Sequence, residues 1–424
     1  MYFTIIAFLV NNLINTILLT LHNLHYILVG MNISLGFSDN KDHIQATNEA
    51  IGQAIIGLGK KRRDLAIIFT TIEFAHPLVL KITNNLLGEI PILGCSSLGI
   101  MTNKGIHKHG FAVLLISLGE QVFLNFAAVK DVNKMTPVAA GRDLGKKLLY
   151  GCKDVRRNLS LIFSDGLITD GTSLINGLQE NLGKSFPLIG VSASDNFAFT
   201  KTFQYFNKEA LSDSCCGLLF GGKMHFGFGI KHGWKPLGKI HHVTKSEGNI
   251  IKEIDGEPAI KLYENYFAKD ALELAKELRR ISIFYPIGVY LEGEKEYLLR
   301  NIISIKDDGS LVTQGDILQD SPIRLMIGTK DSCLSAAAAS CEEAKKDLGA
   351  QAKFIMVFDS AARFTLLGRQ YTKELDIIKA AFGEDVPLIG IYSYGEQAPL
   401  KSISYLGRAY FHNQSMNILA FGGQ

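Results

Sequence analysis

The sequence lacks a cysteine framework. Its 424 residues include six cysteines, and none of them forms a C-x-x-C pair or has the spacing of a zinc site. Scattered cysteines in a chain of this length are typical of a reducing compartment, where thiols stay reduced and partly buried. The composition therefore excludes a disulfide scaffold and indicates the cytoplasm. No P-loop or dinucleotide turn occurs either, so we expect no cofactor and no metal.

The sequence also lacks an excess of charge of either sign. Lys and Arg number 44 against 41 Asp and Glu, which gives a formal charge of +3. This balance offers no electrostatic reason to expect nucleic acid or an anionic membrane as a partner. Hydrophobic residues make up 47% and charged residues 20%, which excludes a disordered chain. At about 100–200 residues per domain, the length predicts two to four domains or one large composite.

Charged residues are absent from the first 38 positions, and the first to appear is Asp39. A secretory signal needs a positive segment and a small-residue cleavage site, and neither is evident. Residues 1–30 are then either an apolar membrane anchor weakened by Asn and His, or the result of a start site assigned too early. We favour translation from Met31, because the residues that follow resemble an opening strand. The protein is expected to be membrane-bound only if residues 1–30 are retained.

One pattern occurs three times along the chain. Its centre has the form Pro-apolar-apolar-Gly-apolar, at Pro91–Cys95, Pro187–Val191 and Pro387–Ile391. Proline at the entrance and glycine at the exit are typical of a short buried strand. An apolar strand and a stretch of helical pattern precede each copy, and another apolar strand follows it. The preceding strands are Leu65–Phe69, Leu159–Phe163 and Phe354–Phe358, and the following strands are Phe111–Leu115, Cys216–Phe220 and Met416–Ala420.

This repetition predicts an α/β or mixed α+β fold, with repeated strand–helix–strand–strand units that form helix-covered sheets in two halves. A strand–helix–strand unit prefers a right-handed crossover, which places its helix on a face of the sheet. Two units fall within residues 31–225, and the third falls within residues 260–424 with extra elements. We expect an apolar extension over residues 1–30, domains over residues 31–230 and 259–424, and a structured junction over residues 231–258.

Several motifs resemble one known family. The stretches Gly233–Gly238 and Ile254–Ala259 are similar to the junction of FIST (F-box and intracellular signal transduction) proteins. Ile90–Leu118 resembles the FIST N-terminal domain, and Pro387–Glu396 followed by Phe411-His412-Asn413 resembles the end of the C-terminal domain. The resemblance covers about residues 31–424 and implies a sensory module of signal transduction that binds a small ligand, with amino acids as candidates.

The same resemblance suggests a stand-alone sensor. The sequence contains no kinase nucleotide motif, no GGDEF sequence and no chemoreceptor coiled coil, so a signalling protein is expected as a partner in trans. One position departs from the family pattern. Family members often carry cysteine just before the Ala-Ala-Arg stretch, whereas this chain has Ser360. The departure puts any thiol role at that position in doubt.

Polar residues near the ends of strands are the candidate ligand-binding residues. Open α/β sheets bind ligands at the carboxyl ends of their strands. There Arg363 could clamp a carboxylate, and Glu396 could pair with an amine. Each also has a structural alternative, namely an ion pair of Arg363 with Glu396 or Asp359, or of Glu396 with Arg408. The full candidate set is Arg363, Tyr394, Glu396, His412 and Asn413.

Two other functions stay open on sequence grounds. One is a hydrolase that uses Ser or Cys as nucleophile and His412 as base, and the other is a scaffold for protein interactions. No convincing set of nucleophile, base and orienting group occurs, so we expect no enzyme activity. Cys95 lacks the G-x-S-x-G context of a nucleophile elbow, and its repeat equivalents are Val191 and Ile391. Cys95 is therefore predicted to be a small buried hydrophobic residue.

Overall fold

The computed structural model describes residues 31–74, 76–152, 155–168, 170–294, 296–400 and 407–422. The prediction for residues 1–30 lies outside the described residues. The predicted fold class is confirmed, because the described chain alternates strands and helices in several mixed sheets covered by helices. Among the described helices, none combines the length and the apolar character that crossing a membrane requires.

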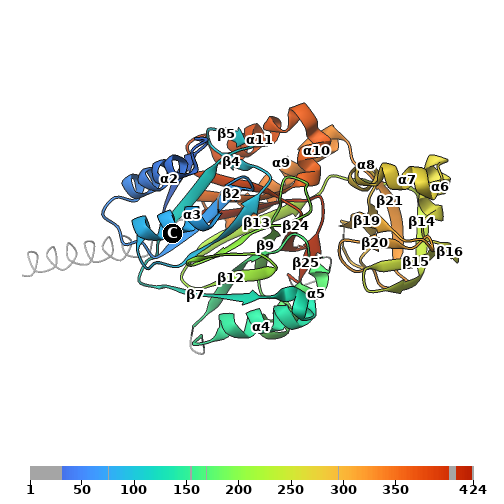
Figure 1. Ribbon diagram of the computed structural model, residues 1–424, viewed down its shortest axis with the longest axis horizontal. Helices are drawn as coiled ribbons and strands as arrows, with labels where there is room; N and C mark the ends of the chain where they lie inside the picture. Colours follow the sequence, from blue (N-terminus) through green and yellow to red (C-terminus); the bar gives the residue numbers. More distant parts are fainter. Residues whose placement is uncertain are drawn as a thin grey trace, which may run out of the picture.

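Three six-stranded sheets form the body of the molecule, and each is built on four strands of one repeat (Figure 1). In each sheet the two central strands are parallel and their other neighbours are antiparallel. The first sheet uses β1 (Asn32–Ser38), β6 (Phe111–Ser117), β2 (Leu65–Thr71) and β3 (Ile92–Ser97). The second uses β7 (Val122–Lys130), β12 (Ser214–Gly222), β8 (Arg157–Ser164) and β9 (Leu188–Ser192). The third uses β13 (His225–Lys231), β26 (Met416–Gly422), β22 (Ala352–Ser360) and β23 (Leu388–Ser393).

Each repeat also contributes a hairpin that completes the sheet of a different repeat. The hairpin of the first repeat pairs with β23 in the third sheet, that of the second with β3 in the first, and that of the third with β9 in the second. The three repeats are therefore linked in a closed cycle. The hairpins are β4–β5 (Ile100–Thr102, Gly105–His107), β10–β11 (Gln204–Phe206, Glu209–Leu211) and β24–β25 (Gly395–Pro399, Ala409–His412).

Apolar side chains cover both faces of these sheets. The inner faces of all three meet in one core, where the rings of Phe69 and Phe163 lie 5.9 Å apart in an edge-to-face arrangement. Helices pack on the outer faces and form a separate cluster with each sheet. Because both faces are covered, β2 is buried along its whole length. The covering helices are α2 (His43–Leu58) and α3 (His76–Leu87), α4 (Pro137–Leu149) and α5 (Gly171–Leu182), and α9 (Lys330–Leu348) and α11 (Thr372–Phe382).

An additional part is inserted into the third repeat between β13 and α9. Its strands follow the order β18-β17-β21-β14-β15-β20-β19, and its apolar side chains form a core of their own. Figure 1 shows this inserted part, in yellow and orange, at one end of the body. Its strands are β14 (Lys235–Glu247), β15 (Ile250–Ile254), β16 (Glu257–Pro258), β17 (Ile287–Val289), β18 (Leu298–Arg300), β19 (Ile302–Ile305), β20 (Leu311–Thr313) and β21 (Pro322–Ile327). Its helices are α6 (Lys261–Phe267), α7 (Ala271–Lys276) and α8 (Leu278–Phe284).

Candidate functional site

A cavity of about 640 Å³ lies between the body and the inserted part, and we call it the interface cavity. On the body side it is lined by residues 166–168 after β8, residues 360–362 at the end of β22, and residues 393–394 at the end of β23. The inserted part contributes side chains from α8, from β19 and from Gln314. The cavity thus occupies the carboxyl ends of the parallel strands, where α/β sheets form ligand crevices.

Phe197, Phe199 and Tyr394 form an aromatic wall of the cavity, and a strained loop after β9 supplies the first two. Asn196, Phe197 and Phe199 all have left-handed backbone conformations, with φ of 56°, 61° and 51°. Each such conformation costs roughly 1–2 kcal/mol outside glycine, so the surrounding structure must hold it. Asp195 does so, because its carboxylate accepts hydrogen bonds from the amides of Phe199, Thr200 and Lys201 at 2.7–3.0 Å.

Tyr394 joins this loop to the third sheet. Its hydroxyl donates to Asp195 at 2.6 Å and accepts from the amide of Phe197 at 2.6 Å. Burial opposes ionisation of Asp195, but the hydrogen bond from Tyr394 and those from the backbone outweigh it and hold the pKa of Asp195 below its usual value. The ring of Tyr394 stacks on Phe199 with centroids 4.7 Å apart. Tyr394 therefore holds Phe197, through its backbone amide, and Phe199, through ring stacking, in place without a ligand.

Arg279 of α8 faces this wall from the inserted part. Its guanidinium carbon lies 3.9 Å from the centroid of the Phe197 ring, a distance typical of a cation–π contact. Within the described part of the chain, Arg279 has no hydrogen bond or ion pair. The cation is thus positioned at the cavity with its N–H donors unused.

Arg363 lies behind the cavity and does not line it. Its guanidinium donates to Asp359 at 2.9 Å and to Glu374, and all three side chains are fully buried. Two further bonds run to the carbonyls of His232 and Cys333 at 2.8 and 3.0 Å. Protein acceptors therefore occupy Arg363, and the ion pair with Asp359 that sequence analysis raised as an alternative is present.

Glu396 is also buried away from the cavity lining. Its carboxylate accepts from the hydroxyls of Ser393 and Ser415 at 2.7 Å each, and from the amide of Ser415 at 3.1 Å. Burial raises the pKa of Glu396 to about 7, against the opposing effect of these hydrogen bonds. Glu396 lies directly opposite His412 in the pairing of β24 with β25, so the sequence candidates are neighbours in the sheet.

Asn413 does not line the cavity itself but forms hydrogen bonds to two residues that do. Its amide donates to the Gln314 side chain at 3.1 Å, and its oxygen accepts from the amide of Asn301 at 3.2 Å. Both Gln314 and Asn301 line the cavity. Of the five sequence candidates, Tyr394 alone lines the cavity among the described residues, and Asn413 holds two residues that do.

His412 should remain neutral through the physiological pH range. Burial lowers its pKa to about 3, and its Nε2–H donates to the carbonyl of Ala398 at 3.0 Å. We expect the imidazole nitrogen resonances of His412 in NMR spectra to stay constant from pH 8 to pH 5. Free histidine in the same buffers, with its ordinary pKa of about 6.5, serves as the reference. A titration of His412 with a midpoint near 6.5 would contradict this assignment.

The predicted burial of Cys95 is confirmed. The side chain is fully inaccessible, and burial raises the pKa of its thiol well above the usual value. The neighbouring Ser96 bonds turn backbone, because its hydroxyl donates to the carbonyl of Ser194 and accepts from the amide of Phe203. All six cysteines are free and buried. None of these thiols is therefore an activated nucleophile.

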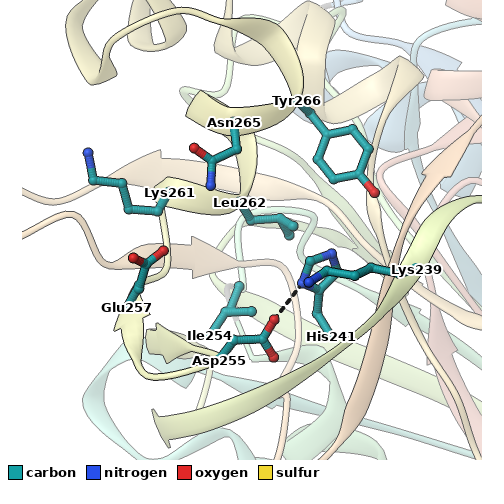
Figure 2. Close-up of a pocket in the computed structure, with 9 residues that line it drawn as sticks. All are labelled: Lys239, His241, Ile254, Asp255, Glu257, Lys261, Leu262, Asn265 and Tyr266. Carbon is teal, nitrogen blue, oxygen red and sulfur yellow. Dashed lines mark hydrogen bonds and ion pairs between the residues drawn. The ribbon is translucent and has the colours of Figure 1, made fainter.

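A second cavity of about 510 Å³ lies wholly within the inserted part (Figure 2). Figure 2 shows Asp255 directed at His241, whose Nδ1–H donates to it at 2.7 Å. Lys261 pairs with Glu264 at 2.6 Å. The formal charges of the lining balance, because two lysines stand against Asp255 and Glu257. Its lining comprises Lys239, His241, Ile254, Asp255, Glu257, Lys261, Leu262, Asn265 and Tyr266.

Sequence reasoning missed Phe197, Phe199 and Arg279. Asp195-Asn196 follows the end of β9, and the two rings after it carry no motif that sequence analysis could recognise. Arg279 belongs to a helix of the inserted part, whose position against the body depends on tertiary packing. Three left-handed non-glycine residues in one loop are the structural signal that draws attention to this wall.

Comparison with known proteins places this geometry in context. A family model described as the FIST N domain matches residues 64–257, and one described as the FIST C domain matches residues 259–399. An uncharacterized protein of Methanocaldococcus jannaschii, MJ1623, is 25% identical over 391 residues, covering 83% of this chain and 74% of that protein. Among solved structures, a cyanuric acid hydrolase aligns at 7% identity with a TM-score of 0.36, over 92% of this chain and 100% of that one.

Proposed function

Since this chain belongs to the FIST family, whose domains are sensory modules of signal transduction, we propose that it senses a small organic ligand in the interface cavity. The observation that carries the proposal is the position of this cavity. Its walls come from two parts of the molecule, and its volume of about 640 Å³ falls within the range of about 300–1,000 Å³ that is usual for small-molecule sites.

Binding across two parts provides a way to signal. A ligand that touches Phe199 and Tyr394 on the body and α8 on the inserted part stabilises the arrangement in which both contacts exist. Such a ligand shifts the population toward that arrangement by as much as its affinity differs between the two states. A separate signalling protein in the cytoplasm would read the change, because this chain carries no recognised output motif.

The proposed role is binding without turnover. The carbonyl partner and low pKa of His412 support this, since a buried imidazole whose Nε2–H is already engaged is poorly placed to act as a base. Amino acids remain candidates through the family resemblance alone. The groups proposed for them, Arg363, Glu396 and His412, all have protein partners in the structure.

The proposal predicts that filling the interface cavity abolishes binding. Ile303 on β19 lines the cavity and is 43% exposed, so tryptophan at this position should occupy ligand space without disturbing the core. Binding would be screened by thermal shift and measured by calorimetry, using amino acids and small carboxylates. We expect Ile303→Trp to lower affinity for any ligand found by at least tenfold.

Ser304→Trp is the matched control, because Ser304 is an exposed residue of the same strand that does not line the cavity. It should bind as the wild type does. The proposal fails if no compound in the screen binds the wild type, or if Ile303→Trp and the wild type bind with equal affinity.

A further inference from the structure

We propose that the ligand of the interface cavity is an aromatic monocarboxylate, with its ring against Phe199 and its carboxylate on Arg279. This inference rests on the proposed function and adds the chemical class of the ligand. It commits to an anion without an ammonium group, and so it distinguishes aromatic acids from free amino acids.

The charge of the cavity lining favours an anion. Among the described residues that line it, Arg279 is the one with a charged side chain. A guanidinium presents five N–H donors in a planar fork that fits a carboxylate with two parallel hydrogen bonds. The position of Arg279 over the Phe197 ring leaves the edge of the guanidinium available, because a cation–π contact uses its face.

The neutral polar groups of the lining are already engaged. Gln314 donates to the carbonyl of Tyr394 at 2.9 Å and accepts from the amides of Asn301 and Asn413. Ser282 accepts from the amide of Ile302 at 2.8 Å. These bonds fix the shape of the wall, and they leave Arg279 as the strongest attraction for a ligand.

An ammonium group would find no free carboxylate in the described lining. Asp195 is saturated by Tyr394 and three backbone amides, and Glu396 is bound by two serines. Neither of them lines the cavity. A zwitterion would therefore lose water from its ammonium without a compensating partner, which is unfavourable.

The apolar part of the cavity lining is the reason for proposing an aromatic ring in the ligand. Phe199 is 55% exposed although one of its faces stacks on Tyr394, so its remaining surface is open to a ligand. Leu167 and Ile168 from the body and Ile302 from the inserted part also line the cavity. Aromatic rings prefer stacked or edge-to-face contacts with such a wall, which a short aliphatic acid cannot make.

Three matched probes test the inference on the intact protein. Indole-3-acetate has the ring and the carboxylate, tryptophan adds an ammonium group on a chain one carbon longer, and indole-3-acetamide removes the charge. In isothermal titration calorimetry at low salt, we expect indole-3-acetate to bind at least tenfold more tightly than either of the others. Raising the salt concentration should weaken indole-3-acetate and leave indole-3-acetamide nearly unchanged.

Two arginine variants test whether Arg279 is the group that binds the carboxylate. Arg279→Gln should remove the tenfold preference for indole-3-acetate over indole-3-acetamide. Arg280→Gln is the matched control, because Arg280 is the adjacent exposed residue and pairs with Glu277 at 3.7 Å outside the lining. It should retain the preference. Both positions are exposed on α8, so neither variant should unfold, and circular dichroism verifies this.

The outcomes separate the inference from the proposed function. Tight binding of tryptophan or of an aliphatic acid that Ile303→Trp abolishes would contradict an aromatic monocarboxylate as the ligand. It would leave the proposed sensory function of the cavity standing. Unchanged affinity in Arg279→Gln would also contradict an aromatic monocarboxylate. Absence of binding by every probe and every compound of the wider screen would overturn both.

Discussion

Arg363→Met is expected to lower the free energy of unfolding by about 3–5 kcal/mol, the usual effect of breaking a buried ion pair from one side. In the native protein Arg363 contacts both Asp359 and Glu374, and none of the three is exposed to water. Burial and repulsion from Glu374 raise the pKa of Asp359 well above its usual value, even with Arg363 present. Removing the cation leaves the two acids facing each other, and urea unfolding at pH 7 measures the loss.

Arg369→Met is the control for the loss of an arginine. Arg369 is exposed in the short 3-10 helix η2 (Gly368–Gln370), so its replacement should change stability by less than about 0.5 kcal/mol. In the Arg363→Met background, adding Glu374→Gln removes one acid and should recover part of the loss. A loss below about 1 kcal/mol in Arg363→Met would show that the buried carboxyl groups do not depend on this guanidinium.

Glu396→Gln should make the protein more stable than the wild type above pH 7. The carboxyl group has a pKa of about 7 in the folded protein and an ordinary value of 4.5. The native state therefore binds the proton more tightly than the unfolded state does. The resulting stabilisation is fully present below pH 4.5 and is lost as the pH rises through 7, and at pH 8 the loss amounts to about 3 kcal/mol. Glutamine has the same shape and carries no such dependence.

The measurement compares the two proteins by urea unfolding at pH 5, 6, 7 and 8. The stability of Glu396→Gln minus that of the wild type should rise across this range. Buried histidines such as His232 have lowered pKa values and lose stability in the opposite direction, as pH falls below 6.5, but they are common to both proteins and cancel. Glu384→Gln, at an exposed side chain, is the control for the substitution of glutamate by glutamine itself. A flat difference for Glu396→Gln would contradict its assigned pKa.

The repeated strands were predictable because their signals are local. Pro91 precedes β3, and the strand covers the apolar run that the sequence indicated. The hairpins carry no comparable signal. The strand β4 could pair within its own sheet or with another, and it joins β23 far along the chain, with Ile100 opposite Ile391. Three similar repeats present similar edges, so a single sequence does not specify which edge each hairpin completes.

The sequence placed its candidate residues at strand ends, and the interface cavity also lies at strand ends. Of those candidates, Tyr394 lines the cavity in the described part of the chain. Arg363 lies only one residue beyond the lining residue Ala362, but the helix α10 (Ala361–Leu367) turns its side chain away from the cavity toward Glu374. Helix periodicity governs that direction, and the sequence pattern gave no indication that Glu374 would be a buried partner. The same limit applies to Arg279, which reaches the site from a different part of the fold.

The closed cycle of hairpins has a consequence for synthesis on the ribosome. The first hairpin leaves the ribosome long before β23 exists, since Ile100 of β4 must wait for its partner Ile391. At about 5–20 residues per second, the hairpin waits roughly 15–60 s with an unpaired edge. Exposed strand edges are the usual starting points of aggregation, so a nascent chain of this protein depends on protection until its last repeat emerges.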